Sequence, residues 1–328
     1  MRTQFPNFTN PAKMKLELIN IITAVISFGI LMIFNIYIYP LLKKLRFISD
    51  GSETDSGREA LPVSGGILPA AASFTSSAAV YAVIRAVTEI DVNDLNSHKL
   101  LFSGEIIILL AFACGFYSDL LKSRGKKGGM SKGVQQIFIC MLCICFLILK
   151  FIFLPDERAV KIPFSGEYNL RSYYYPLCFA VMLVTFDCVS FSGESSKGAA
   201  MAAMLFSGIS SLSVSADGSI FSAALSGAFT AFFFLNFPRV NILAGKSGSL
   251  FMGMAAAEAA VSSDNMIYIL IMLIPFYFAR IKNILPKKQT ADKNIRYDKK
   301  TVLTTAAYFA FSAVCVLAAA ALSKLNAG

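Results

Sequence analysis

The stretch LFSGEIIILLAFACGFYSDLL, residues 101–121, decides the class of fold. It matches the ~20 predominantly apolar residues that an α-helix needs to cross the hydrocarbon core of a bilayer. Similar apolar runs recur along the whole chain of 328 residues, of which 56% are hydrophobic and only 15% charged. Soluble domains carry roughly 25% charged residues. The sequence therefore predicts an all-α integral membrane protein, and it excludes a soluble enzyme, a secreted disulfide scaffold and a disordered chain.

We expect a single polytopic membrane domain over residues 1–328 with about ten transmembrane helices. The predicted spans are residues 18–41, 66–87, 101–121, 134–154, 173–191, 197–213, 219–237, 248–262, 265–282 and 302–323. The sixth and eighth spans are short and rich in glycine, alanine and serine, which favours close helix–helix contact over contact with lipid.

The distribution of lysine and arginine predicts the orientation of the chain. Ten spans leave five loops on the face opposite both termini. These loops cover residues of about 42–65, 122–133, 191–197, 238–248 and 283–301. Together with the adjoining span ends they hold 20 of the 30 lysines and arginines. Because basic loops stay in the cytoplasm, we expect these loops to be cytoplasmic and both termini extracytoplasmic. The net charge of +10 then reflects topology, and no nucleic-acid partner is expected.

Glycine-rich turns lie beside basic residues on this predicted cytoplasmic face. Each alone is typical of a loop that leaves the membrane, but together they combine exposed N–H groups at helix starts with cations, which is how phosphate is bound. The candidate substrate-binding residues are Arg58, Gly65, Gly66, Lys122, Asn236, Lys246, Ser247 and Ser249. The run Gly245-Lys246-Ser247 is not a Walker A motif, because Val240 stands where that motif needs glycine.

The order and spacing of these motifs resemble the MraY-type phospho-N-acetylmuramoyl-pentapeptide transferases, within the polyprenyl-phosphate N-acetylhexosamine-1-phosphate transferases. The family's T-P-T-M-G-G motif resembles residues 61–66, and its G-F-x-D-D-x-x-K motif resembles residues 115–122. Its G-L-S…Q motif resembles residues 129–136, and its N-F-x-P…F-M-G-D-x-G-S-L block resembles residues 236–250. The resemblance runs from about residue 35 to the C-terminus. It implies an MraY-like bundle in the bacterial cytoplasmic (inner) membrane, multi-pass, serving the synthesis of cell-envelope glycans such as peptidoglycan.

Most acidic residues of these family motifs are replaced. The family's Asp-Asp pair is Ser118 and Asp119, and the two aspartates of its D-G-x-D-G motif are Ser192 and Ser195. The aspartate before its G-S-L sequence is Lys246. Four of five family carboxylates are thus absent, and Asp119 is the catalytic candidate that remains. The family's histidine motif in the last cytoplasmic loop is also missing.

These replacements bear on the family's Mg²⁺, which helps to bind the nucleotide-sugar pyrophosphate. Mg²⁺ needs oxygen ligands, and a lysine ammonium supplies no lone pair. We therefore expect no metal and no other cofactor, and Mg²⁺ only if the chain is an active transferase. Glu194 and Asp187 are further candidate acids near this face. Glu105 and Glu258 lie within apolar spans, where an acid either locks helices together or serves a proton or ligand path.

Three functions follow as hypotheses. The leading one is a pseudoenzyme: an inactive or much weakened relative that binds a lipid phosphate, a nucleotide sugar or a membrane partner. The first alternative is an active transferase that moves sugar-1-phosphate from a UDP-sugar to undecaprenyl phosphate. The second is a carrier of lipid-linked intermediates that depends on Glu258 or Glu105. The expected partners are a membrane lipid or undecaprenyl phosphate, a UDP-sugar, and a membrane-protein partner or second copy of the chain.

Overall fold

The structure is a computed structural model of the chain and is mostly helical. It describes residues 11–44, 64–87, 95–124, 129–154, 159–163, 165–193, 196–212, 216–237, 241–262, 265–284 and 299–326. The predicted sites at Arg58, Glu194 and Ser195 lie outside the described residues, as does the side chain of Ser192.

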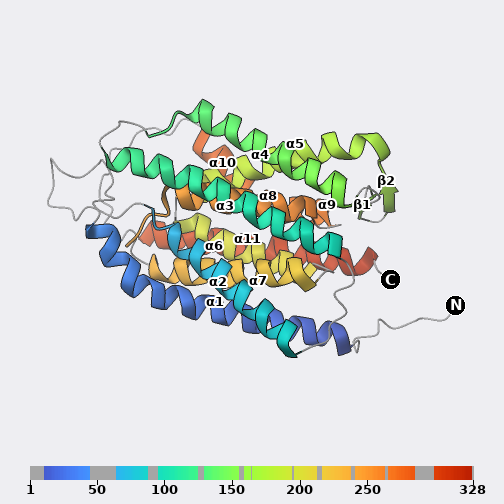
Figure 1. The fold of residues 1–328 in the computed structure, drawn as a ribbon, viewed down its shortest axis with the longest axis horizontal. Coiled ribbons are helices and arrows are strands. Elements are labelled where there is room, and N and C mark those ends of the chain that lie inside the picture. The colour runs from blue at the N-terminus through green and yellow to red at the C-terminus, as the bar shows by residue number, and fades with distance from the viewer. Residues whose placement is uncertain are drawn as a thin grey trace.

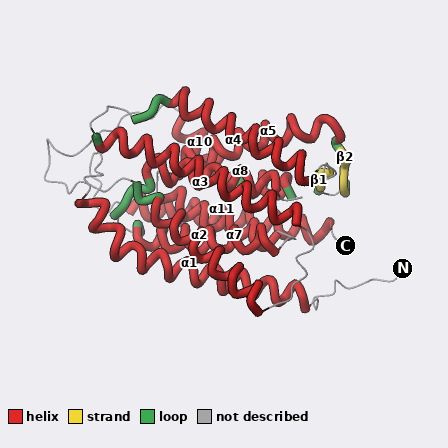
Figure 2. Tube along the Cα trace, in the orientation of Figure 1, coloured by secondary structure: helices red, strands yellow, loops and turns green. Residues whose placement is uncertain are grey.

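The helices of these ranges pack side by side as one bundle (Figure 1). They are α1 (Pro11–Lys44), α2 (Ile67–Val87), α3 (Leu95–Ser123), α4 (Lys132–Phe153), α5 (Tyr174–Gly193), α6 (Ser196–Leu212), α7 (Ala216–Leu235), α8 (Gly245–Ser262), α9 (Met266–Met272), α10 (Ile274–Ile284) and α11 (Lys299–Asn326). Each predicted span coincides with one helix except the ninth, which coincides with both α9 and α10. Between α4 and α5 lie an antiparallel hairpin of β1 (Ala159–Ile162) and β2 (Gly166–Asn169) and the single turn η1 (Arg171–Tyr173) (Figure 2).

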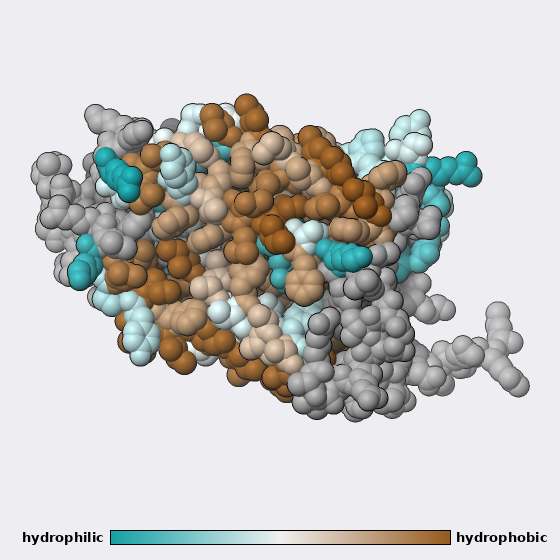
Figure 3. All heavy atoms as spheres, in the orientation of Figure 1, coloured by the Kyte–Doolittle hydropathy of each residue, from teal (hydrophilic) through white to brown (hydrophobic). Residues whose placement is uncertain are grey.

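Among the described residues, six helices are long and apolar enough to cross a membrane by length and composition: those within α1 to α5 and α11. Apolar side chains cover most of the middle of the face seen in Figure 3, and many large ones on these helices are exposed, as lipid contact requires. The fold is therefore that of an all-α membrane protein. The other helices of the described chain are shorter or richer in small residues, so the count of ten spans stays a prediction.

The ninth predicted span is divided by a proline. Pro275 has no N–H to donate to the carbonyl of Ile271, and its ring crowds that turn. At the break, the Phe276 N–H donates to the Leu273 carbonyl at 2.9 Å, three residues earlier. The chain therefore leaves the α-helical pattern at Leu273 and resumes as α10, which packs against α5.

Helix α8 is the central helix, and it packs mainly against α3 and α5. All its residues are buried except Gly245, Lys246, Glu258 and Ser262. Its small side chains permit this, because they allow neighbouring backbones to approach closely. A Cβ added at Gly253 would stand 2.9 Å from the Phe186 carbonyl oxygen of α5. The weakly apolar eighth span is thus the best-covered helix of the bundle.

Different segments of the chain lie at the two ends of the bundle. Helix α1 begins and α11 ends at the same end, together with the hairpin (Figure 1). At the opposite end lie the turn at residues 64–66, the end of α3, the start of α4 and the start of α8. The motifs that resemble the transferase family therefore meet at one end. Which side of the membrane this end faces stays a prediction from the basic loops.

Candidate functional site

The glycine motif before α2 forms a tight joint with the start of α8. Its backbone pairs with the segment that precedes α8: the N–H of Gly65 donates to the Leu243 carbonyl at 2.8 Å, and the N–H of Gly66 donates to the Ala244 carbonyl at 3.0 Å. A Cβ at Gly66 would stand 2.1 Å from the Gly248 nitrogen, closer than any real side chain permits. Glycine is therefore required here for backbone contact, and a phosphate could reach these N–H groups only by displacing existing hydrogen bonds.

Helix α3 joins the same point through a second glycine. A Cβ at Gly115 would lie 2.5 Å from the Lys246 carbonyl oxygen and 2.7 Å from the Ser247 Cα. The backbones of α3 and α8 are thus in direct contact one turn before Asp119. This contact brings the two motifs that the sequence placed about 130 residues apart to the same site.

The Asp119 carboxylate caps the start of α8. Its Oδ1 accepts the Lys246 N–H at 3.0 Å, and its Oδ2 accepts the Ser247 N–H at 2.9 Å and the Ser64 hydroxyl at 3.0 Å. Only 2% of Asp119 is exposed. A carboxylate at a helix N-terminus binds free N–H groups and the positive end of the helix dipole. Asp119 therefore links α3, the turn before α2 and α8 at one buried point.

Ser118 stands where the family has the first aspartate of its pair, and it too is bound within the fold. It is 1% exposed, and its hydroxyl accepts the Met130 N–H at 3.3 Å. Gly129 makes this turn possible with a φ of 67°, and an added Cβ would lie 2.8 Å from the Ser118 hydroxyl. Ser118 thus fixes residues 129–130, just before α4, against the end of α3.

Lys246 lies at the start of α8, next to Asp119 at the end of α3. Its backbone N–H binds Asp119, and its residue is partly exposed. Ser247 and Ser249 are buried, and their hydroxyls donate to the carbonyls of Ala244 and Lys246. These two serines therefore lie inside the bundle, whereas Gly245 and Lys246 are partly exposed.

Asn236 organises the connection from α7 to α8. Its amide oxygen accepts the N–H groups of Asn241 and Ile242 at 3.0 and 2.9 Å, and its amide nitrogen donates to the Phe232 carbonyl. Because Asn236 is 2% exposed, its side chain acts inside the loop. Lys122, another predicted binding residue, is partly exposed on the last turn of α3.

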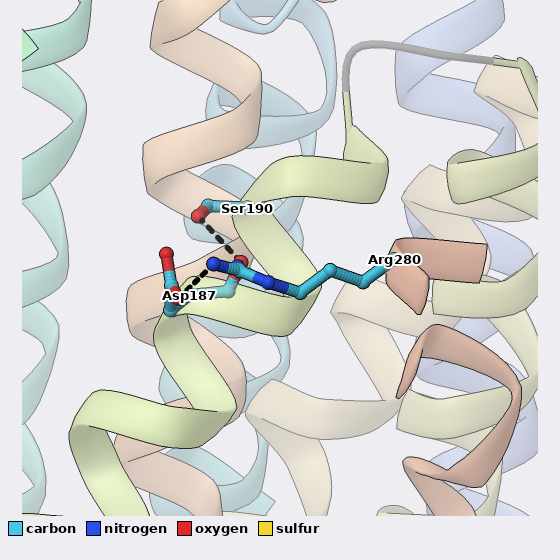
Figure 4. A network of polar contacts seen from close by, with 3 residues as sticks. All are labelled: Asp187, Ser190 and Arg280. Atoms are coloured by element: carbon cyan, nitrogen blue, oxygen red, sulfur yellow. Dashed lines mark hydrogen bonds and ion pairs between the residues drawn. The ribbon is translucent and has the colours of Figure 1, made fainter. Parts of the chain in front are cut away.

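Asp187 forms an ion pair that sequence reasoning missed. The Arg280 guanidinium reaches from α10 to α5 and binds both the Asp187 carboxylate and, at 2.8 Å, the Asp187 carbonyl oxygen (Figure 4). It also lies over the Phe191 ring, 5.5 Å from the centroid. The pair fastens α10 to α5 after the proline break. The signal in the sequence was an acid and an arginine near the predicted cytoplasmic ends of two spans, but their contact depends on the break.

The far end of α8 holds a second buried charge that the sequence analysis did not single out. Lys150 of α4 is 2% exposed, and its amine donates to the Val261 carbonyl at 2.7 Å and lies 5.6 Å from the Tyr174 ring centroid. It interacts electrostatically with Glu258, which accepts a hydrogen bond from Ser262 and lies against Gly104 of α3. Glu258 therefore has partners inside the bundle, as the helix-locking interpretation of the intramembrane acids requires. Glu105 also has an interaction partner.

The donor set at the start of α8 does not fit Mg²⁺. The described residues hold no group of three or more His, Cys, Asp or Glu side chains placed to share a metal ion. Three of the four carboxylate lone pairs of Asp119 already accept hydrogen bonds. Ser118 and Lys246 offer one hydroxyl, already hydrogen-bonded, and one cation beside it. The described residues at the start of α8 therefore do not form a ligand set for Mg²⁺.

The fold and the candidate site define a helical membrane protein whose glycine motifs meet at the start of the central helix α8. Comparison with known families gives the same class of protein. The family described as Glycosyl transferase family 4 matches residues 101–264, which are half of the chain and cover most of α3 and all of α4 to α8. The chain belongs to this family, the MraY-like polyprenyl-phosphate phospho-sugar transferases, as the motifs predicted.

Among known proteins, the chain is similar to phospho-N-acetylmuramoyl-pentapeptide-transferases of bacteria. It is 24% identical to that of Clostridioides difficile (strain 630) over 80% of both chains. It is 25% identical to that of Caldicellulosiruptor bescii over 78% of both chains. It is 27% identical to that of Clostridium perfringens (strain SM101 / Type A) over 74% of this chain and 73% of the relative.

Proposed function

We propose that the chain is a phospho-sugar transferase homologue of the bacterial cytoplasmic membrane whose transfer activity is lost or much weakened. It binds a lipid phosphate or a nucleotide sugar at the partly exposed cation beside the capped start of α8. The observation that carries the proposal is the set of three hydrogen bonds to Asp119, the one family acid that remains. These bonds assign its carboxylate to holding the fold together.

Electrostatics at residue 246 supports the same proposal. Two unit charges ~4 Å apart at an effective dielectric constant of ~20 interact by about 4 kcal/mol. A change from aspartate to lysine turns that interaction with a divalent ion from attraction into repulsion. The same ammonium attracts a phosphate without a metal. Binding of phosphate is therefore retained, while the metal-held geometry that favours phosphoryl transfer is lost.

The two alternative functions draw less support from the contacts. An active transferase would use Asp119, Glu194 and Asp187, but Asp119 caps α8 and Asp187 is paired with Arg280. A carrier would use Glu258, which is hydrogen-bonded to Ser262 and close to Lys150. We further propose one polytopic domain over residues 1–328 with the start of α8 facing the cytoplasm and both termini outside. The basic loops and the shared end of α1 and α11 support this orientation.

The decisive experiment measures binding and transfer on the same purified full-length chain. Radiolabelled undecaprenyl phosphate and UDP-N-acetylhexosamines are added with Mg²⁺ or with EDTA. We expect binding of at least one of them that EDTA leaves unchanged and that Lys246→Gln weakens, and no turnover in the range of roughly 1–10³ per second that is typical of enzymes. Lys99→Gln, at the other end of α3, is the matched control and should bind normally. Turnover in that range, or binding that requires Mg²⁺, would contradict the proposal.

Restoring the acids tests the electrostatic argument directly. The double variant Ser118→Asp with Lys246→Asp places carboxylates where the family has them. We expect it to gain Mg²⁺-dependent binding of the UDP-sugar and to lose the binding that needs no metal. Ser118→Asn with Lys246→Gln is the neutral control, and thermal unfolding in detergent reports whether each variant is folded. If the acidic variant is folded, binds as the unmodified chain does and does not respond to Mg²⁺, residue 246 is not part of the ligand site.

A further inference from the structure

An apolar groove runs between α3 and α4 on the surface of the bundle, beside the candidate site. Its wall is formed by Cys114 and Tyr117 of α3, Val134 and Phe138 of α4, and Met130 of the turn between them. Its volume is about 260 Å³. Tyr117 and Val134 are each more than half exposed, whereas the neighbouring Ser118 and Asp119 are buried on the inner side of α3. The groove is therefore separate from the α8 joint and opens outward.

The residues around the groove are apolar and exposed, which favours an apolar ligand. Helices α3 and α4 both contain candidate membrane spans, and Ile137 and Met141 of α4 are 72% and 52% exposed close to the groove. A surface of this kind faces lipid chains, which excludes a water-soluble ligand. Val134 and Phe138 lie two and six residues after the first residue of α4. At 1.5 Å per residue they lie about 3–9 Å along the helix axis from Lys132, the first residue of α4.

Basic side chains surround the end of the groove where the helices start and stop. Lys122 is on the last turn of α3, Arg124 follows it, and Lys132 opens α4. The stem of Lys122 lies against the turn, with its Cγ 3.0 Å from a Cβ position at Gly129, next to Met130. Arg124 and Lys132 are exposed, and the sequence from 122 to 132 contains no acid. A lysine at the positive start of a helix is unfavourable unless an anion lies beside it.

We propose that this groove binds one anionic phospholipid of the surrounding membrane. An acyl chain lies along Cys114, Tyr117, Val134 and Phe138, and the lipid phosphate is bound by the three basic residues above it. Charge complementarity selects the anionic headgroup, since basic residues next to a membrane span attract anionic lipids. The proposal does not rest on the phospho-sugar function, because the described hydrogen bonds of the Asp119 carboxylate join it to Ser64, Lys246 and Ser247 and to no residue of the groove.

The lipid would touch the candidate site through one hydrogen bond. Met130 lines the groove, and its N–H donates to the Ser118 hydroxyl at 3.3 Å. A lipid that orders the 129–131 turn therefore also orders the position next to Asp119. This gives the surrounding lipid a route to influence the end of α3.

The absence of tryptophan from the chain makes the test direct. Phe138→Trp puts the sole tryptophan in the groove of the full-length protein, reconstituted in nanodiscs. Its fluorescence is quenched by brominated phosphatidylglycerol or by brominated phosphatidylcholine mixed into the disc. The ratio of the two quenching efficiencies cancels the depth of the residue. We expect phosphatidylglycerol to bind at least about 5-fold more tightly than phosphatidylcholine, the preference that one surface basic residue provides.

Two sets of variants decide the source of that preference. Lys122→Gln, Arg124→Gln and Lys132→Gln together should bring the ratio close to one, whereas Lys122→Arg with Lys132→Arg should preserve it. Phe311→Trp on α11 is the control at a lipid-facing position and should show no preference. If Phe138→Trp does not fold, Val134→Trp replaces it.

Three results would overturn the proposal. A ratio near one in the groove would mean ordinary surrounding lipid only. A preference that survives the triple glutamine variant would assign it to other residues. Fluorescence that neither lipid quenches would mean that protein, such as a second copy of the chain, covers the groove.

Discussion

The two ends of the central helix α8 are both held by a buried charge, but they are built differently. At its start, Asp119 accepts two backbone N–H groups, and glycines bring three chain segments into backbone contact. At its end, one long side chain, Lys150, reaches the Val261 carbonyl. Each charge has the sign that the helix dipole favours at its end. At the start of α8, where the candidate site lies, close backbone packing at glycines adds to the charge of Asp119. At its end, a single charged side chain makes the connection.

The largest effect is expected from added volume at the start. Gly66→Val would push side-chain atoms into the backbone of Gly248, which has no rotamer to change. We expect loss of folded protein, beyond the about 4–5 kcal/mol that marks an exceptional single substitution. Size-exclusion chromatography and thermal unfolding in detergent measure it. Gly29→Val is the control, since nothing lies within 4 Å of its Cβ position. A Gly66→Val protein as stable as that control would show that the joint is loose.

A smaller effect is expected from removal of the charge at the other end. Lys150→Met keeps most of the side-chain volume but leaves the Val261 carbonyl without its amine and Glu258 without a nearby cation. The loss is expected to be about 3 kcal/mol, the upper end of the range for a hydrogen bond to a charged group. Unfolding in mixed detergent micelles measures this, and Lys150→Met combined with Glu258→Gln should recover part of the loss. Equal instability of the single and double variants would argue against coupling between the two charges.

The smallest effect of the three is expected from neutralising the cap. Asp119→Asn retains one acceptor oxygen, so part of the hydrogen bonding to Lys246, Ser247 and Ser64 survives. We expect a loss of about 2 kcal/mol, within the range for hydrogen bonds to a charged group. Asp187→Asn breaks a half-exposed ion pair and should cost less than about 1 kcal/mol. If Asp119→Asn were no more destabilising than Asp187→Asn, the cap would not hold the site together.

Much of the fold could be predicted because each membrane-spanning helix corresponds to a continuous run of apolar residues in the sequence. The apolar runs located each helix from α1 to α11 to within a few residues, apart from the starts of α1 and α3 and the break at Leu273. The break was missed because the run from 265 to 282 is apolar without interruption around the break, and Pro275 is the residue in it that indicates a break. The burial of α8 followed from its small residues, which allow the contact at Gly253.

The sequence predicted which segments form the candidate site, but it did not predict what each residue does there. The motifs marked residues 115–119 and 245–249 as parts of the candidate site, and in the structure these two segments are in contact. They did not predict that Asp119 would cap α8, because glycine-rich turns serve phosphate binding and backbone packing equally well. Lys150 and Arg280 went unnoticed as partners, because one binds a backbone carbonyl and the other depends on a helix break.

The sequence alone determined that the chain lies in a membrane as helices, which family it belongs to, and that four of the family's acids are replaced. These properties depend on composition and on residues a few positions apart. The tertiary structure alone decided which N–H groups remain open to a ligand and which charge binds which end of α8. Those outcomes depend on contacts between segments more than 100 residues apart, where a difference of a few ångströms separates a cap from a ligand site.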